Sequence, residues 1–243
     1  MKQIESKLSQ MRFKGMNRCW QALLETRRAH ELSLTEGLEI LLQAEEDDRR
    51  NSRFERLRKS ARFRYQATLE ELNYNPERKL DKDLVTILAT CEYLTKGESI
   101  VISGATGCGK SFLASALGYH ACSHGYSVAY FNTQKLLMRI KMSRLDGTIM
   151  KFFDKLAKTS LLILDDFGMA HMDQKQQFDL MEIMEDRHGK TSTIISSQLS
   201  ISAWYDVISE SSIADAILDR VVHTSYRIEL EGYDNNLIMQ SPI

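Results

Sequence analysis

The stretch that decides the fold of this chain reads Gly104-Ala105-Thr106-Gly107-Cys108-Gly109-Lys110-Ser111. It matches the pattern G-x-x-x-x-G-K-[ST] in full, and its glycines let the backbone curl so that successive N–H groups point at phosphate oxygens. Lys110 is expected to reach the β- and γ-phosphates, and the Ser111 hydroxyl is expected to ligate Mg²⁺. An apolar run precedes the loop and a helical pattern follows it, at Ile100–Ser103 and Ser111–Cys122. This order of strand, loop and helix favours a phosphate-binding loop over a chance match in a glycine-rich turn.

A second stretch supplies the acidic groups that such a loop needs. It reads Leu161-Leu162-Ile163-Leu164-Asp165-Asp166, which predicts a buried strand that ends in two carboxylates. Asp165 is expected to hold Mg²⁺ through water, and Asp166 to orient or deprotonate the attacking water. Two adjacent carboxylates alone more often belong to a solvated turn or a helix cap, but their position after four aliphatic residues favours a site that hydrolyses ATP. The residues expected to contact ATP here are Gly104, Ala105, Thr106, Gly107, Cys108, Gly109, Lys110, Ser111 and Phe112.

The rest of the second half alternates between strand-like and helix-like segments. Strands separated by helices predict an α/β fold, with a parallel sheet covered by helices on both faces. Residues 1–75 show helical spacing instead, with a capping box at Ser33 and Glu36, until turn formers cluster at Asn73–Pro76. We therefore predict a small all-helical domain over residues 1–72 and an ATPase domain over residues 73–243. The further strands are expected at Ser127–Asn132, Leu161–Asp165, Thr193–Ser197 and Tyr226–Leu230.

Composition and the remaining reactive residues set further bounds. The net charge is −1, and the sequence has neither an apolar signal-peptide core nor a run of the roughly 20 apolar residues that span a bilayer, so a cytoplasmic protein without membrane contact is expected. Met138 and Met142 fall at helical spacing and are expected to be buried. The cysteines lack metal-ligand spacing and the histidines are dispersed, which predicts reduced thiols and no ligand set. The cysteines are Cys19, Cys91, Cys108 and Cys122, and the histidines include His120, His124, His171, His188 and His223.

A family signature runs through the second half of the chain. Its segments are Gly104–Ser111 with Phe112-Leu113-Ala114, Leu161–Gly168, Ile194–Gln198 followed by Trp204, and Ala216–His223. These segments resemble the AAA+ ATPases, and specifically the IstB/DnaC-like branch of insertion-sequence transposition helpers and helicase loaders. Similarity extends through the N-terminal helices, so it covers nearly the whole chain. The compact chain, the helical N-terminal domain and the Ser-Ser-Gln…Trp segment make it most similar to the IstB transposition helpers.

The resemblance implies three further roles. Gln198 takes the place of the polar sensor that contacts the γ-phosphate or the lytic water, with its neighbour Ser197 as the second choice. Without the family, Gln198 is interpreted as an ordinary strand-end residue. Arg220 takes the place of the arginine finger, a cation donated into the ATP site of a neighbouring subunit, and hydrolysis then requires a homo-oligomer. Alone, Arg220 beside Asp219 reads as a salt-bridged surface residue. Tyr74 falls where relatives bring the chain past the adenine.

One departure from the family lies after the last strand. Relatives commonly carry a basic residue there, which acts as a second sensor on the phosphates. In this chain Asn236 takes the basic position. The departure puts efficient hydrolysis in doubt, and a second sensor supplied by Arg227 stays open.

Two basic stretches are candidates for contact with DNA. An acidic run at Glu45–Asp48 is followed by a run of arginines on a predicted helix, and a basic strip of this kind suits contact with duplex phosphates without base readout. The acidic run is also one helical turn away, so pairing between the two runs is the alternative. Initiator-type relatives place a helical insertion after the second strand toward DNA, which implies the second stretch. The two stretches are Arg49, Arg50, Arg53 and Arg56, and Arg139, Lys141 and Arg144.

Together, the motifs and the resemblance imply an Mg²⁺-dependent ATPase that binds double-stranded DNA, assembles into a ring or filament on it, and assists a transposase in selecting target DNA. Stimulation of hydrolysis by DNA and by oligomerisation is expected. A first alternative is a DnaC-type loader that acts on single-stranded DNA and a replicative helicase. A second alternative is a monomeric nucleotide switch or small kinase, against which the lack of a recognisable acceptor-substrate motif counts mildly.

Overall fold

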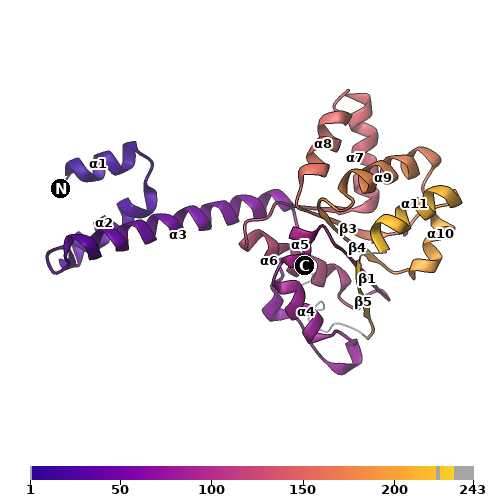
Figure 1. The fold of residues 1–243 in the computed structure, drawn as a ribbon, viewed down its shortest axis with the longest axis horizontal. Helices are drawn as coiled ribbons and strands as arrows, with labels where there is room; N and C mark the ends of the chain where they lie inside the picture. The colour runs from indigo at the N-terminus through magenta and orange to yellow at the C-terminus, as the bar shows by residue number, and fades with distance from the viewer. Residues whose placement is uncertain (1, 223–224, 233–243) are drawn as a thin grey trace, which may run out of the picture. The chain divides into compact units, whose positions relative to one another are not determined.

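The computed structural model describes residues 2–222 and 225–232, and the chain divides into two compact units, Met1–Arg56 and Leu57–Ile243 (Figure 1). The division falls earlier than the predicted boundary between residues 72 and 73. Residues 62–72 fold with the second unit, where the ring of Phe63 lies edge-on to Tyr130 at 6.3 Å and Ala67 is buried. The turn formers at Asn73–Pro76 therefore lie inside the second unit and do not separate two domains.

The first unit consists of helices. They are α1 (Lys2–Gln10), α2 (Lys14–Glu25), the short η1 (Arg28–His30) and the first part of α3 (Leu34–Ala61). The predicted capping box is confirmed, because the Ser33 N–H donates to the Glu36 carboxylate at 2.9 Å and the Glu36 N–H donates to the Ser33 hydroxyl at 3.3 Å. Gly15 permits close contact between α2 and α3, since its N–H donates to the buried carboxylate of Glu45 at 2.8 Å.

The second unit holds one parallel sheet. Its strands are β1 (Ser99–Gly104), β2 (Val128–Asn132), β3 (Leu161–Phe167), β4 (Ser192–Ser197) and β5 (Ser225–Leu230). They lie in the order β2-β3-β4-β1-β5, and every pair is parallel. The predicted strands are therefore confirmed. Because β4 lies between β1 and β3, the phosphate loop after β1 and the acidic end of β3 flank the end of β4.

The helices of this unit cover both faces of the sheet (Figure 1). Alternate strand residues face opposite layers, as the period of a strand requires. Leu162 and Leu164 lie in a core with α7, α8, α9, α10 and α11, whereas Ile163 lies against Gly118 of α6. The helical segments are η2 (Leu69–Glu71), η3 (Pro76–Arg78), α4 (Lys82–Ala89), α5 (Glu92–Lys96), α6 (Lys110–Ser123), α7 (Thr133–Leu145), α8 (Ile149–Lys158), α9 (Gln174–Arg187), η4 (Ile201–Ala203), α10 (Trp204–Val207) and α11 (Ser211–Val222).

Two observations concern the apolar residues of the helices. Across the described residues, none of the helices combines the length and the apolar character that crossing a membrane requires. The expected burial of Met138 and Met142 is wrong, because their side chains are 67% and 58% exposed. The buried stripe of α7 is formed by Leu136, Leu137 and Ile140 instead, and the methionines lie beside a pocket.

Candidate nucleotide-binding site

The phosphate loop joins β1 to α6. Three of its glycines occupy positions at which a residue with a Cβ atom is disfavoured. Gly107 and Gly109 have φ angles of 84° and 91°, and Gly109 caps the N-terminus of α6. Gly104 has a φ of 145°, and a Cβ atom there would lie 2.2 Å from the carbonyl oxygen of Leu230. A left-handed backbone and a close approach of two chains are the conditions that favour glycine. The loop therefore has the conformation that its motif predicts.

Lys110 and Thr106 link the loop to itself and to β4. The Lys110 ammonium, in a residue only 7% exposed, donates to the carbonyl oxygens of Gly104 and Ala105 at 2.7 Å each. The Thr106 hydroxyl donates to the side-chain oxygen of Gln198 at 2.7 Å. The structure thus brings Gln198 to the phosphate loop, the place where a sensor of the γ-phosphate must lie. Its role as a sensor stays a prediction.

Arg78 is a residue of this site that the sequence reading missed. Its side chain is buried, and the guanidinium donates to the Cys108 carbonyl at 2.8 Å and to the Asn73 carbonyl at 2.7 Å. It therefore fixes the middle of the phosphate loop to the segment that contains Tyr74. Lys82 lies over the Tyr74 ring at 5.9 Å, and burial raises the pKa of the Tyr74 hydroxyl. Whether Tyr74 contacts adenine stays a prediction.

Asp165 is fully buried at the end of β3, where hydroxyl groups surround its carboxylate. Ser111 donates to its Oδ1 at 2.9 Å, Ser196 of β4 also donates to Oδ1, and Tyr130 of β2 donates to Oδ2. Burial raises the pKa of Tyr130, and the charge of Asp165 raises it further, so the phenol keeps its proton and acts as a donor. A buried carboxylate requires such partners because an unpaired buried charge is costly.

Asp166 differs from its neighbour in backbone and in exposure. Its φ is 55°, at an irregularity in the pairing of β3 with β4, and its side chain is 27% exposed. Asn132 at the end of β2 donates to its Oδ2 at 2.9 Å, and Arg64 donates to the same oxygen at 3.1 Å. Arg64 also donates to Oδ2 of Asp165 at 3.3 Å, so one guanidinium joins both carboxylates.

Asn132 and Arg64 were not predicted from the sequence. Asn132 ends a predicted strand beside the strand of Asp166, so the parallel pairing of β2 with β3 was the signal that could have identified it. Arg64 is about 100 residues from the acids in sequence, and nothing local marks it.

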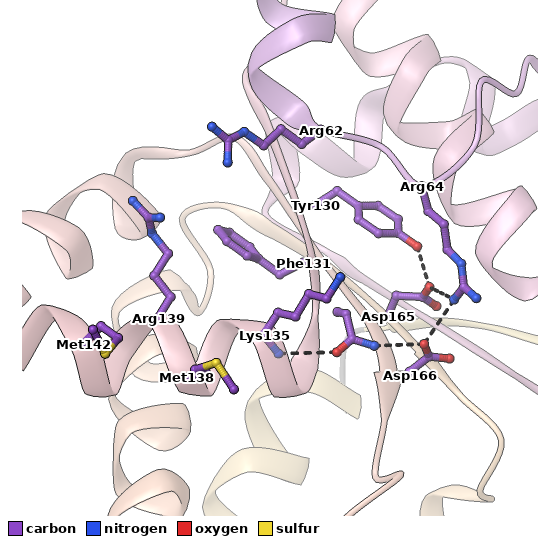
Figure 2. A pocket seen from close by; sticks show the side chains of 11 residues that line it. Arg62, Arg64, Tyr130, Phe131, Lys135, Met138, Arg139, Met142, Asp165 and Asp166 are labelled. Carbon is purple, nitrogen blue, oxygen red and sulfur yellow. Dashed lines mark hydrogen bonds and ion pairs between the residues drawn. The ribbon is translucent and has the colours of Figure 1, made fainter.

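A pocket of about 770 Å³ opens beside the two carboxylates (Figure 2). Figure 2 shows Asp165 and Asp166 at one end of the pocket and Arg139 with the methionines of α7 at the other. Its walls combine four basic, two acidic and two aromatic side chains with an asparagine and two methionines. The lining residues are Arg62, Arg64, Tyr130, Phe131, Asn132, Lys135, Met138, Arg139, Met142, Asp165 and Asp166.

The donor set fits the ligands that the motif implies. Mg²⁺ prefers oxygen ligands, and Ser111 and Asp165 present oxygens that already lie 2.9 Å apart. The positive N-terminal end of α6 and the Lys110 ammonium favour an anion at the loop. The structure therefore brings together Gly104–Ser111, Asp165, Asp166 and Gln198 as expected.

Arg220 lies on α11 and forms an ion pair with Glu185 of α9. Its guanidinium also donates to the Ala216 carbonyl at 2.9 Å, and it lines a separate pocket of about 580 Å³ together with Arg227. Within the described chain it is thus a salt-bridged residue on another surface, as a finger for a neighbouring subunit must be in its own subunit. Its role in trans stays a prediction. Asn236, the departure from the family, lies outside the described residues.

The two basic stretches are partly neutralised within the chain. Arg49 pairs with Glu45 at 2.8 Å and Arg50 with Glu46 at 2.9 Å, as the alternative interpretation expected. The side chains of both arginines remain more than half exposed, and Arg53 and Arg56 are exposed as well.

The second stretch lies on α7. Arg144 pairs with Asp179, Arg139 lies over the Phe152 ring at 5.3 Å, and Lys141 is exposed. Contact of either stretch with DNA stays a prediction.

Comparison with known proteins identifies a family over almost the full length. Residues 6–240 match the family of IstB-like ATP binding proteins. The insertion sequence ATP-binding protein y4pL of Sinorhizobium fredii is 38% identical over 226 residues, which cover 93% of this chain and 92% of the relative. An insertion sequence IS1162 ATP-binding protein of Pseudomonas fluorescens is 39% identical over 198 residues, which cover 81% of this chain and 86% of the relative.

Solved structures share the fold of the second unit. The match to DnaI has a TM-score of 0.57 at 20% identity and covers 68% of this chain and 91% of DnaI. The match to the DnaC helicase loader has a TM-score of 0.55 at 20% identity and covers 69% and 98%. The replication initiator DnaA, solved with AMPPCP and single-stranded DNA, gives a TM-score of 0.56 at 20% identity over 70% of this chain and 51% of DnaA. The predicted AAA+ fold class is confirmed.

Proposed function

The chain belongs to the family of IstB-like ATP binding proteins, and on that premise we propose that it is an ATP-hydrolysing regulator that assembles on double-stranded DNA and assists a transposase in choosing its target. The observation that carries the proposal is the pairing of a complete nucleotide site with close similarity to insertion sequence ATP-binding proteins over nearly the whole chain. Because insertion sequences move by transposition, an ATP-binding protein that one of them encodes is expected to act in transposition.

The site residues divide the work of hydrolysis. Lys110 exchanges the carbonyls of Gly104 and Ala105 for the phosphates of ATP, since an ammonium favours the more highly charged acceptor. Ser111 and Asp165 would hold Mg²⁺, which would neutralise charge on the phosphates. Asp166, the more exposed carboxylate, accepts a proton from the attacking water or orients it. Asn132 and Arg64 set the direction of its carboxylate before the nucleotide binds.

Oligomerisation adds a residue from a neighbouring subunit to each ATP site. Arg220 leaves Glu185 and inserts its guanidinium into the ATP site of the next subunit, where it offsets the charge that develops on the transferred phosphoryl group. Glu185 is 59% exposed and Arg220 26% exposed, so water can solvate the Glu185 carboxylate when the ion pair opens. ATP then stabilises the contact between subunits, and its hydrolysis releases them.

DNA contacts come from the two basic stretches. The arginines of α3 and the cations of α7 are spaced for phosphates and carry no evident base readout. Among them, Arg53, Arg56 and Lys141 are the best test positions, because Arg49 neutralises the buried Glu45 and its loss would disturb the helical unit itself.

The test is electron microscopy of the full-length protein with duplex DNA and ATP, ADP or no nucleotide, with ATPase assays on the same samples. Rings or filaments that form on duplex only with ATP, and that Lys110→Ala abolishes, support the proposal. Arg53→Glu/Arg56→Glu weakens assembly, whereas the charge-matched control Lys175→Glu/Lys190→Glu, on exposed residues of the ATPase unit, leaves it intact. A monomer that is indifferent to DNA would overturn the proposal in favour of a nucleotide switch.

The second candidate is a helicase loader, which the shared fold with the DnaC loader favours. It predicts a preference for single-stranded DNA and a stable complex with a hexameric replicative helicase. Competition between labelled duplex and single strands for the ATP-bound protein separates the two candidates.

A further inference from the structure

Three metal-binding side chains meet at the C-terminal end of α6, away from the nucleotide site. His120 lies in the last turn of α6, His124 is the residue that caps the end of that helix, and Cys91 lies at the junction between α4 and α5. One ligand atom of each lies within 4.8 Å of the others. His120 is ten residues beyond Lys110, which is about 15 Å along the helix. The expectation that the histidines and cysteines are too dispersed to form a ligand set is therefore wrong for this trio.

Each of the two histidines has one ring nitrogen on a backbone carbonyl. Nε2 of His120 lies 2.8 Å from the Ala89 carbonyl oxygen, and Nδ1 of His124 lies 3.0 Å from the His120 carbonyl oxygen. A carbonyl only accepts, so each of these ring nitrogens carries the hydrogen. The other nitrogen of each neutral ring then has a lone pair. Metal-bound histidines are oriented in this way, with the second N–H on a carbonyl or carboxylate.

Cys91 is placed by an unusual backbone. Its φ is 59°, in the left-handed region that non-glycine residues adopt at a cost of about 1 kcal/mol or more, and its residue is only 3% exposed. The nucleotide site makes no use of the Cys91 thiol. His124 by contrast is exposed, which leaves a path for an ion to enter.

We propose that Cys91, His120 and His124 form a zinc site, with water as the fourth ligand. One thiolate and two imidazoles are the borderline-soft donors that Zn²⁺ selects, and two histidines four residues apart on a helix are a common half of such a site. Binding replaces the thiol proton with the metal, so each ion that binds releases one proton.

The bound ion would join the segment that enters β1 to the helix that leaves the phosphate loop. Its role is structural, because it lies too far from the phosphates to touch them. An ion that binds the folded chain and not the unfolded chain raises stability in proportion to the logarithm of its concentration over its Kd.

The test uses the full-length, metal-free protein titrated with Co²⁺ as a spectroscopic probe and then with Zn²⁺. We expect one Co²⁺ per chain, with a thiolate-to-cobalt charge-transfer band, intense tetrahedral absorption and the release of one proton. One equivalent of Zn²⁺ should abolish both absorptions without proton uptake, because the thiolate passes from one ion to the other. Cys91→Ala and His120→Ala should lose the band and weaken Zn²⁺ binding at least about tenfold. The matched control Cys122→Ala removes a buried thiol from α6, the helix that carries His120. It should leave the cobalt band and Zn²⁺ binding unchanged.

The outcomes separate clearly. The proposal is overturned if the parent protein shows no cobalt band. It is also overturned if the band persists in Cys91→Ala and vanishes in Cys122→Ala. If Cys91→Ala does not fold, His124→Ala replaces it, because that side chain is exposed and its loss leaves the core intact. A rise in Tm with Zn²⁺ in the parent and in Cys122→Ala, but not in His124→Ala, supports the site.

Discussion

The two ends of α6 carry two sites that are built in different ways. At the N-terminal end, eight consecutive residues form the phosphate loop, and local sequence alone determines most of its geometry. At the C-terminal end, the trio of Cys91, His120 and His124 is assembled by the fold from two separate segments. This difference shows that a site can be predicted from a sequence to the extent that its residues are contiguous. Four predictions test the roles of residues at the two ends and in the middle of α6, and beside the acidic end of β3.

The largest effect concerns Asp166, the carboxylate that we propose as the general base at the nucleotide end. Asp166→Asn should lower ATP turnover about 100- to 10,000-fold, because it removes the proposed general base, while ATP affinity changes little. Asparagine tolerates the left-handed backbone of this position, so the fold is preserved. Steady-state hydrolysis and binding of a fluorescent ATP analogue measure the two quantities. Equal losses in Asp165→Asn and Asp166→Asn, with ATP binding retained in both, would contradict the division of roles between them.

The second prediction tests whether the two ends of α6 bind their ligands independently of each other. Lys110→Ala should weaken ATP binding on the order of 100-fold, since it removes a buried charge that pairs with the phosphates. Cobalt binding at the other end should be unchanged. Conversely, His124→Ala should lose cobalt and retain ATP. Joint loss of both activities in Lys110→Ala would show that the ends are not independent.

The third prediction concerns the middle of α6. A Cβ atom on Gly118 would lie 2.5 Å from Cε1 of Phe63 and 2.8 Å from Cδ1 of Ile163. Gly118→Ala should therefore lower the free energy of unfolding by about 1–3 kcal/mol through overpacking. Gly37→Ala is the control, because nothing lies within 4 Å of that position on a helix, and it should stabilise slightly. Urea denaturation measures both, and a neutral Gly118→Ala would mean that the helix shifts freely on the sheet.

The smallest effect concerns Arg64, whose guanidinium occupies the acids that Mg²⁺ would use. Arg64→Ala should lower the Mg²⁺ concentration needed for half-maximal nucleotide binding by about two- to fivefold, as expected for a partly exposed ion pair. Arg62→Ala, two residues away in the same pocket, is the control. A higher Mg²⁺ requirement in Arg64→Ala would instead assign Arg64 a supporting role toward the phosphates.

Much of the fold was predictable because its signals are local. Short segments rich in apolar residues predicted the five strands of the described residues, and the motif at residues 104–111 predicted the loop, its helix and the edge of the sheet at which the site lies. The family resemblance is likewise confirmed by the match over residues 6–240. Each of these inferences depends on neighbours in sequence or on a short period.

The remainder depends on contacts between distant residues. Arg78 sits in a turn-like Pro-Glu-Arg-Lys segment, and only the fold shows that its guanidinium is buried under the phosphate loop. Arg64 reaches the acids across about 100 residues. The spacing of Met138 and Met142 is helical, but spacing does not say which face of a helix the sheet covers. The four-residue interval between His120 and His124 was visible, whereas their partner Cys91 was not.

Gly104 has a consequence for any survey of tolerated substitutions in the loop. Its neighbour is the carbonyl of Leu230 on β5, so the first glycine of the motif is required by the protein's own backbone before any phosphate arrives. Ala105 and Thr106, in contrast, are exposed. Selection for folding alone should therefore already eliminate variants at position 104, while variants at 105 and 106 should persist until selection for nucleotide use is applied. One eight-residue motif would then show two separate layers of constraint, one imposed by the fold and one by the ligand.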